Sequence, residues 1–214
     1  MTNKKALNIV HYCANEYKRN LAQKCLLFVT KRDNTVFFEV VFLPQNFKHL
    51  TGIFSKLSGL DFYNLAVKNR LSPRDIALAD DGTTDLKLDV LPQLVRIHTT
   101  ARMVGAYDQS KSLLVTDKVA GTVTAAMGFI QTKGMYLPNT ALKKDVREVT
   151  QFATRYRVVA IFSRHRHTKM YVNLTYIAKG LVLEDLLPAM GKCMDLSNLT
   201  AAFPIPRKQS DMHE

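Results

Sequence analysis

The chain has 214 residues, of which 47% are hydrophobic and 22% charged, and its formal net charge is +12. This composition is typical of a folded protein and excludes a disordered or collagen-like chain. Its longest apolar runs are far shorter than the roughly 20 residues of a membrane span, and the N-terminus shows no secretory signal. Because its three cysteines are odd in number and have no metal-like spacing, we expect a cytoplasmic protein.

The positive charge is concentrated in two parts of the chain. Residues 1–32 contain seven Lys and Arg against one Glu, and residues 131–170 contain nine bases against two acids. The rest of the chain is nearly neutral. Bases that bind a phosphate backbone release its condensed counterions, so this clustering favours a nucleic-acid partner. The alternative is that the charge serves solubility alone.

Hydrophobic spacing predicts a helix-rich first half. Apolar residues step by three and four positions between Leu7 and Leu21, which makes one helical stripe. Two Val- and Phe-rich runs, Cys25–Thr30 and Thr35–Leu43, predict a β-hairpin around residues 31–34. Further helices are predicted from Pro44 to a Gly52 cap, after Ser58, at Ser72-Pro73-Arg74-Asp75, and from Thr83 or Thr84 to Thr99 with a kink or restart at Pro92.

Alternating patterns predict an antiparallel sheet in the second half. Val119–Ile130 reads as one long strand, which a turn connects to Met135–Leu142, where Pro138 indicates an edge or a bulge. Arg157–Ser163 and Met170–Ala178 predict a second hairpin. The fold class is therefore α+β, with a helix-rich N-terminal half followed by an antiparallel sheet of about four to five strands. We expect one domain, residues 1–200, and a flexible tail, residues 201–214.

His49 is the leading candidate for chemistry. It lies in the last turn of the short helix that Gly52 ends, where the partial negative charge of a helix C-terminus favours imidazolium. A histidine that titrates near neutral pH can take a proton from a ribose 2′-hydroxyl or give one to a leaving oxygen. The adjacent Thr51 offers a hydroxyl for a phosphate. The alternative is that His49 only caps its own helix.

Three further residues offer groups that a phosphate can use. Lys118 begins the long alternating strand and would stabilise the charge on a pentacoordinate phosphorus, although a surface lysine paired with Asp117 is the alternative. Asn139 is a polar residue at the predicted bulge, and turn chemistry explains it equally well. Thr175 lies on a polar face of the last hairpin, which a solvated sheet surface also explains.

The last hairpin and its flanks carry the candidate nucleic-acid-binding residues. Their basic groups would hold an RNA backbone, and an aromatic ring among them can stack a base. These residues are Arg155, Arg157, Arg164, Arg166, Lys169 and Tyr171. His165 and His167 would share a strand face as metal ligands do, but no third ligand lies close by in the sequence. We expect neither a metal nor a cofactor.

Five stretches of the sequence are distinctive when taken together: FLPQNFKHLTG, DDGTTDLKLDVLPQL, TDKVAGTVTAAMGF, YLPNTALKKDVR and LTYIAKG. They resemble a phage and mobile-element family of Firmicutes, the phage variant of the Barnase–EndoU–colicin–RelE-like nucleases. The resemblance extends from about residue 5 to residue 186. It implies an α+β fold and metal-independent RNA cleavage that leaves a 2′,3′-cyclic phosphate. It maps the His, the Lys or Arg, and the hydroxyl or amide residue of that class onto His49, Lys118, and Thr51, Asn139 or Thr175.

The leading hypothesis is a metal-independent endoribonuclease that acts on RNA as a phage or mobile-element toxin or effector. One alternative is a nucleic-acid-binding module without turnover. Another is a protein-binding regulator of a mobile element, for which the acidic stretch 75–89 would matter more than the bases. An inhibitor protein (immunity protein or antitoxin) stays open as a further partner, and so does the oligomeric state.

Overall fold

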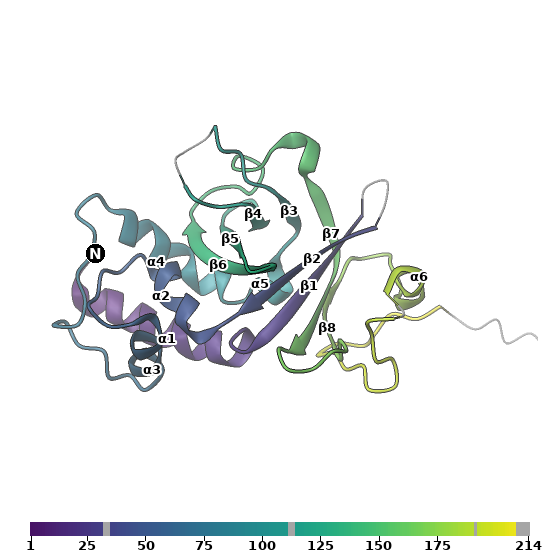
Figure 1. The fold of residues 1–214 in the computed structure, drawn as a ribbon, viewed down its shortest axis with the longest axis horizontal. Helices are drawn as coiled ribbons and strands as arrows, with labels where there is room; N and C mark the ends of the chain where they lie inside the picture. Colours follow the sequence, from purple (N-terminus) through teal and green to yellow (C-terminus); the bar gives the residue numbers. More distant parts are fainter. Residues whose placement is uncertain (32–34, 111–113, 191, 209–214) are drawn as a thin grey trace, which may run out of the picture.

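Helices and strands from both halves of the chain form a mixed α+β fold in the computed structural model, which describes residues 1–31, 35–110, 114–190 and 192–208 (Figure 1). The helices are α1 (Asn3–Asn20), α2 (Phe47–Thr51), α3 (Gly59–Val67), α4 (Thr83–Leu94), α5 (Ile97–Thr100) and α6 (Leu187–Met190), with short 3-10 turns η1 (Pro44–Asn46), η2 (Phe152–Thr154) and η3 (Leu183–Asp185). The strands are β1 (Lys24–Lys31), β2 (Thr35–Phe42), β3 (Met103–Ala106), β4 (Lys118–Gly121), β5 (Ala126–Thr132), β6 (Met135–Leu142), β7 (Tyr156–His165) and β8 (Asn173–Ile177).

The sheet closes on itself. Its strand order is β1-β2-β6-β5-β4-β3-β7-β8, and a further pairing of β1 with β7 completes a ring. The pairings are antiparallel except that β2 meets β6 in parallel at Val40 and Tyr136. Aromatic rings from β1, β2 and β5 contact one another in the main core, with Phe28–Phe38 and Phe38–Phe129 centroids 5.8 and 5.4 Å apart. The ring includes β1 and β2 from the first half, so the sheet exceeds the predicted four to five strands.

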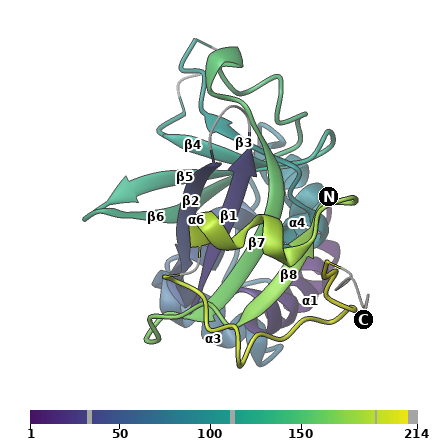
Figure 2. The ribbon, with the colours of Figure 1, turned by 90° about the vertical axis from the view of Figure 1, so that its right-hand side faces the viewer.

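The helices that precede β3 gather on one side of this sheet (Figures 1 and 2). α1 begins after the N-cap Thr2, and its predicted apolar stripe from Leu7 to Leu21 is buried. Pro44 starts the turn before α2, and Gly52 ends α2 in the left-handed region at a φ of 66°, as predicted. Ser58 caps α3 by accepting a hydrogen bond from the Asp61 N–H, also as predicted. α2 and α4 both contact β6.

Two of the predicted helices differ in the structure. Ser72–Asp75 forms a turn instead of a helix, because the Asp75 carboxylate accepts hydrogen bonds from both the N–H and the hydroxyl of Ser72 (2.8 and 2.7 Å). The chain then extends to pair with Phe54 at Ala77. The predicted helix from residue 83 to residue 99 divides into α4 and α5. The break lies at residues 95–96, whereas Pro92, where a kink or restart was predicted, lies inside α4.

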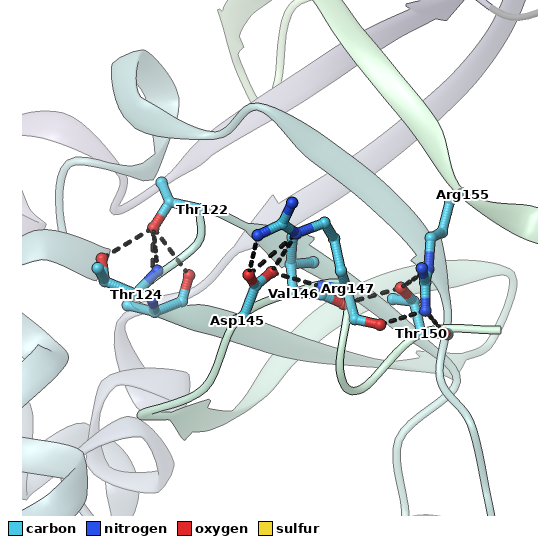
Figure 3. Close-up of polar contacts among 8 residues, drawn as sticks. Thr122, Thr124, Asp145, Val146, Arg147, Thr150 and Arg155 are labelled. Atoms are coloured by element: carbon cyan, nitrogen blue, oxygen red, sulfur yellow. Dashed lines mark hydrogen bonds and ion pairs between the residues drawn. The ribbon is translucent and has the colours of Figure 1, made fainter. Parts of the chain in front are cut away.

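The predicted single strand Val119–Ile130 is wrong, because the chain reverses within it. β4 and β5 are antiparallel neighbours joined by residues 122–125. The Thr122 hydroxyl accepts hydrogen bonds from the N–H groups of Thr124 and Ala125 and so closes the turn (Figure 3). Gly121 permits the reversal, since a Cβ at this position would lie 2.3 Å from the Ala125 carbonyl oxygen. Alternation alone did not reveal the turn.

The two predicted hairpins of the second half are confirmed. β5 and β6 are joined through Lys133 and Gly134, both at positive φ, which suits a two-residue hairpin turn. A register shift lies opposite Pro138–Thr140, so Asn139 occupies the predicted bulge. β7 and β8 form the second hairpin.

The C-terminal segment packs on the opposite side of β1, β7 and β8 from the main core, in a second apolar cluster. Its Phe203 and Ile205 contact this cluster, and the Leu183 N–H donates to the Pro206 carbonyl oxygen. Residues 201–208 of the expected flexible tail are therefore packed, whereas 209–214 lie outside the described residues. Of the turn predicted at residues 31–34, residues 32–34 lie outside them as well. Within the part of the chain that is described, no helix is long and apolar enough to cross a membrane.

Candidate functional site

A hollow of about 410 Å³ lies where α2, α4 and the bulge of β6 meet. These elements are far apart in the sequence, and they bring a histidine, two lysines, an aspartate and an asparagine to one place. The five residues are Lys48, His49, Asp81, Lys87 and Asn139. The hollow is open to solvent and more basic than acidic, which suits an anionic group.

His49 lies exposed in the last turn of α2 and lines this hollow. Partial burial of its ring lowers its pKa below the usual 6.5, and the positive charges of Lys48 and Lys87 lower it further. The expectation that the helix C-terminus would favour imidazolium is therefore wrong, because two nearby cations oppose it. The imidazole is neutral at pH 7 and can accept a proton.

Lys87 reaches the hollow from α4, one helical turn after Thr84. The buried Thr84 hydroxyl donates to the Gly52 carbonyl oxygen at 2.8 Å, which joins the start of α4 to the end of α2. The Lys87 side chain then crosses Gly52 so closely that a Cβ there would lie 2.7 Å from Lys87 Cδ. Burial lowers the pKa of Lys87. No hydrogen bond or ion pair to its ammonium group occurs among the described residues, so this group is available to a ligand.

The other polar groups of the hollow are partly occupied. Lys48 Nζ donates to the carbonyl oxygens of Ser55 and Leu57 (2.8 and 2.7 Å) and so holds the loop after α2. The Asn139 amide donates to the Val115 carbonyl oxygen at 2.6 Å. Its oxygen accepts from the Thr116 hydroxyl at 3.3 Å, which leaves one N–H free for a ligand.

Asp81 contributes the carboxylate of the hollow. It accepts a hydrogen bond from the Thr83 N–H at the start of α4, and this bond lowers its pKa.

The structure brings His49 and Asn139 together but places the other predicted catalytic residues elsewhere. Thr51 is fully buried; its hydroxyl donates to the Lys48 carbonyl oxygen and accepts from the Ile53 N–H, so it does not reach the hollow. Lys118 lies on β4, and β5 lies between β4 and β6, so β4 is about 10 Å from β6. Lys118 does not line the hollow. Asp117, which was the alternative partner for Lys118, accepts a hydrogen bond from the Gln131 N–H.

Thr175 belongs to a different hollow, beside α5. Its hydroxyl contacts the carbonyl oxygens of His98 and Ile161, at 2.6 and 3.0 Å. Burial lowers the pKa of His98 to about 4, and its buried Nδ1 has no hydrogen-bond partner among the described residues.

The predicted nucleic-acid-binding residues do not form one continuous stripe. Arg155 is tied into its own loop by hydrogen bonds to Thr150 and to the Arg147 carbonyl oxygen (Figure 3). Arg164 is paired with Glu39 at 2.6 Å.

Tyr171 is 4% exposed and donates to the same Glu39 carboxylate, so its ring has no room for a base. Arg157, Arg166 and Lys169 are exposed, but like the others they lie outside the His49 hollow. No group of three or more His, Cys, Asp or Glu side chains placed to hold a metal occurs in the described part of the chain.

Comparison with known families places this site within a nuclease domain. A family model described as phage-Barnase-EndoU-ColicinE5/D-RelE like nuclease4 matches residues 9–180. The chain belongs to this family. The matched range includes His49, Lys87 and Asn139 and ends before the C-terminal segment that begins at about residue 181. No curated protein and no solved structure matches the chain. The family resemblance found in the sequence is thus confirmed.

Sequence reasoning missed Lys87, the lysine that shares the hollow with His49. Lys87 lies in one of the five family-like stretches, DDGTTDLKLDVLPQL, but its helix alternates acids with bases and so has no conspicuous charge. The link from Thr84 to Gly52 and the close passage of Lys87 over Gly52 are tertiary contacts that no local pattern predicts.

Proposed function

We propose that this nuclease is a metal-independent endoribonuclease in which His49 is the general base and Lys87 stabilises the charged phosphorus. The observation that carries the proposal is that a neutral imidazole and a lysine ammonium with no hydrogen-bond or ion-pair partner among the described residues line the same open, basic hollow. Proton transfer and charge stabilisation are the two contributions that RNA transesterification requires from an enzyme.

In the proposed reaction, His49 accepts the proton of a ribose 2′-hydroxyl while the 2′-oxygen attacks the adjacent phosphorus. The bond from phosphorus to the 5′-oxygen then breaks and leaves a 2′,3′-cyclic phosphate. The departing 5′-oxygen receives its proton from the His49 imidazolium, which returns the base to its neutral form. Lys87 and the free N–H of Asn139 would contact the nonbridging oxygens, where negative charge increases in the transition state.

The biological role that fits this activity is that of a phage or mobile-element toxin or effector acting on cellular RNA. The word phage in the family's description supports that setting. The RNA is the proposed partner, and an inhibitor protein would then be needed by any cell that carries the gene.

The test is cleavage of end-labelled RNA in EDTA by the wild-type protein and by His49→Ala and Lys87→Ala. We expect cleavage in EDTA with cyclic-phosphate ends, and losses of about 10²- to 10³-fold in each variant. An oligonucleotide with 2′-deoxyribose throughout should stay intact. Cleavage that requires Mg²⁺, or a His49→Ala variant with full activity, refutes the mechanism.

Lys118→Ala decides between the two candidate lysines. If Lys87 supplies the charge, Lys118→Ala keeps wild-type activity while Lys87→Ala loses it. If Lys118→Ala loses activity and Lys87→Ala keeps it, Lys118 stabilises the charge and the His49 hollow is not the active site. Thermal unfolding of all three variants establishes that each is folded.

A further inference from the structure

Beside the His49 hollow, an aromatic residue is largely exposed to solvent. Phe54 is 65% exposed, although it lies in a loop whose neighbours Ile53 and Ile76 are buried. The ring lies between two depressions, since Phe54 and Ser55 line both the His49 hollow and a second hollow of about 580 Å³. A molecule that extends from one hollow into the other passes along Phe54 and Ser55, the residues that the two hollows share.

The backbone that presents Phe54 is firmly held. The N–H groups of Phe54 and Ala77 each donate to the other residue's carbonyl oxygen, at 2.9 and 2.8 Å. Both side chains of such a pair project to the same side, and the methyl group of Ala77 is too small to cover the ring. Lys48, the neighbour of His49 in α2, fixes the far side of the loop through Ser55 and Leu57. The backbone of Phe54 is therefore fixed relative to α2, which carries His49.

The second hollow is basic. Lys56 and Arg74 line it, both exposed and without an ion pair or hydrogen bond among the described residues. Its one carboxylate, Asp75, accepts two hydrogen bonds from Ser72. Cations beyond an exposed aromatic ring fit a strand in which phosphates alternate with bases, and they favour a polyanion over an apolar protein partner.

We propose that Phe54 stacks a nucleobase adjacent to the scissile phosphate, and that the substrate is therefore single-stranded RNA. This inference rests on the proposed function. One phosphate lies between His49 and Lys87, the neighbouring base lies on the Phe54 ring, and the strand continues toward Lys56 and Arg74. A base in a duplex is already stacked on both sides, so paired RNA does not fit this arrangement.

The probe is a single-stranded oligonucleotide with 2′-O-methyl ribose throughout and one 2-aminopurine base. It lacks the free 2′-hydroxyl, so it cannot be cleaved by transesterification and reports binding alone. We expect the wild-type protein to quench the 2-aminopurine fluorescence, because stacking quenches this base. Phe54→Ala should weaken binding by about 5- to 150-fold and abolish the quenching. Phe54→Trp should keep both.

Phe152→Ala is the matched control, because Phe152 is also a highly exposed ring but lies outside both hollows. It should bind the probe as the wild type does. The subsite is rejected if Phe54→Ala binds the probe normally, if Phe152→Ala is equally impaired, or if the same sequence in a duplex binds as tightly. Because the probe is not cleaved, the binding assay and the RNA cleavage assay can fail separately. If the probe stacks on Phe54 but the protein does not cleave RNA, only the proposed function is overturned. If the protein cleaves RNA and Phe54→Ala cleaves it equally well, only the subsite is overturned.

Discussion

Substitution of Gly52 by alanine should lower the kcat/KM of the nuclease strongly, while it lowers the free energy of unfolding only moderately. Gly52 has a φ of 66°, and a side chain in this left-handed region costs about 1–2 kcal/mol. The new Cβ would also lie 2.7 Å from Lys87 Cδ, whereas ordinary contacts begin at 3.4 Å, so the lysine must retreat by about 0.7 Å. Lys87 is flexible and can do so without disrupting the core, but its ammonium group then shifts by a similar amount within the hollow.

The matched variant is Gly180→Ala. Gly180 has a similar φ of 85°, but a Cβ there meets nothing within 4 Å, and it lies far from the hollow. Both variants should lose about 1–2 kcal/mol of unfolding free energy in urea titrations. Only Gly52→Ala should also lower kcat/KM, by about 10- to 100-fold, since a misplacement of about 1 Å has that effect on a catalytic group. Equal kcat/KM in the two variants would show that the position of Lys87 does not matter.

Two further predictions concern histidines. NMR titration of His49 should give a pKa below 6.5, and Lys87→Met should raise this pKa because a positive charge is removed; a wild-type value at or above 6.5 contradicts the assignment of His49 as a neutral base. His98 has a pKa of about 4 in the folded protein because burial and the positive charges of Lys24 and Arg96 lower it, while the negative charge of Glu16 opposes them. As the pH is lowered, the unfolded chain therefore protonates this histidine before the folded protein does. The free energy of unfolding has its full value above pH 6.5 and falls by up to about 1.4 kcal/mol per pH unit between pH 6.5 and 4. His98→Gln should flatten this fall in urea unfolding curves, and an unchanged slope would show that another group causes it.

Local signals predicted the elements that local chemistry determines. The stripe from Leu7 to Leu21, the Gly52 cap and the turn predicted at residues 131–134 each depend on neighbours in the sequence. The structure has all three, with the turn narrowed to Lys133 and Gly134. Ring closure was not predictable in this way. It depends on the pairing of β1 with β7, more than a hundred residues apart, and on one parallel contact between Val40 and Tyr136.

The charge distribution directed the prediction of nucleic-acid-binding residues to bases that lie outside the His49 hollow. Residues 45–90 contain six bases and six acids, so this segment has no net charge, and none of its Lys or Arg residues was predicted to bind nucleic acid. Yet four of those bases, Lys48, Lys56, Arg74 and Lys87, line the two hollows on either side of Phe54. In contrast, Arg155 and Arg164, from the most basic segment, are bound by groups of the protein itself. Net charge along a sequence does not show which charges the fold leaves available.

His49 and Lys87 form a coupled pair, and the coupling has a consequence for catalysis. The charge of Lys87 helps to keep the His49 imidazole neutral, and in the proposed reaction the same charge stabilises the phosphorus. Loss of this charge would therefore weaken transition-state stabilisation and, by raising the His49 pKa, also reduce the fraction of active base at mildly acidic pH. The deficit of a Lys87→Met enzyme should accordingly grow as the pH falls from 8 to 6. A deficit that is constant over this range would mean that the two side chains act independently.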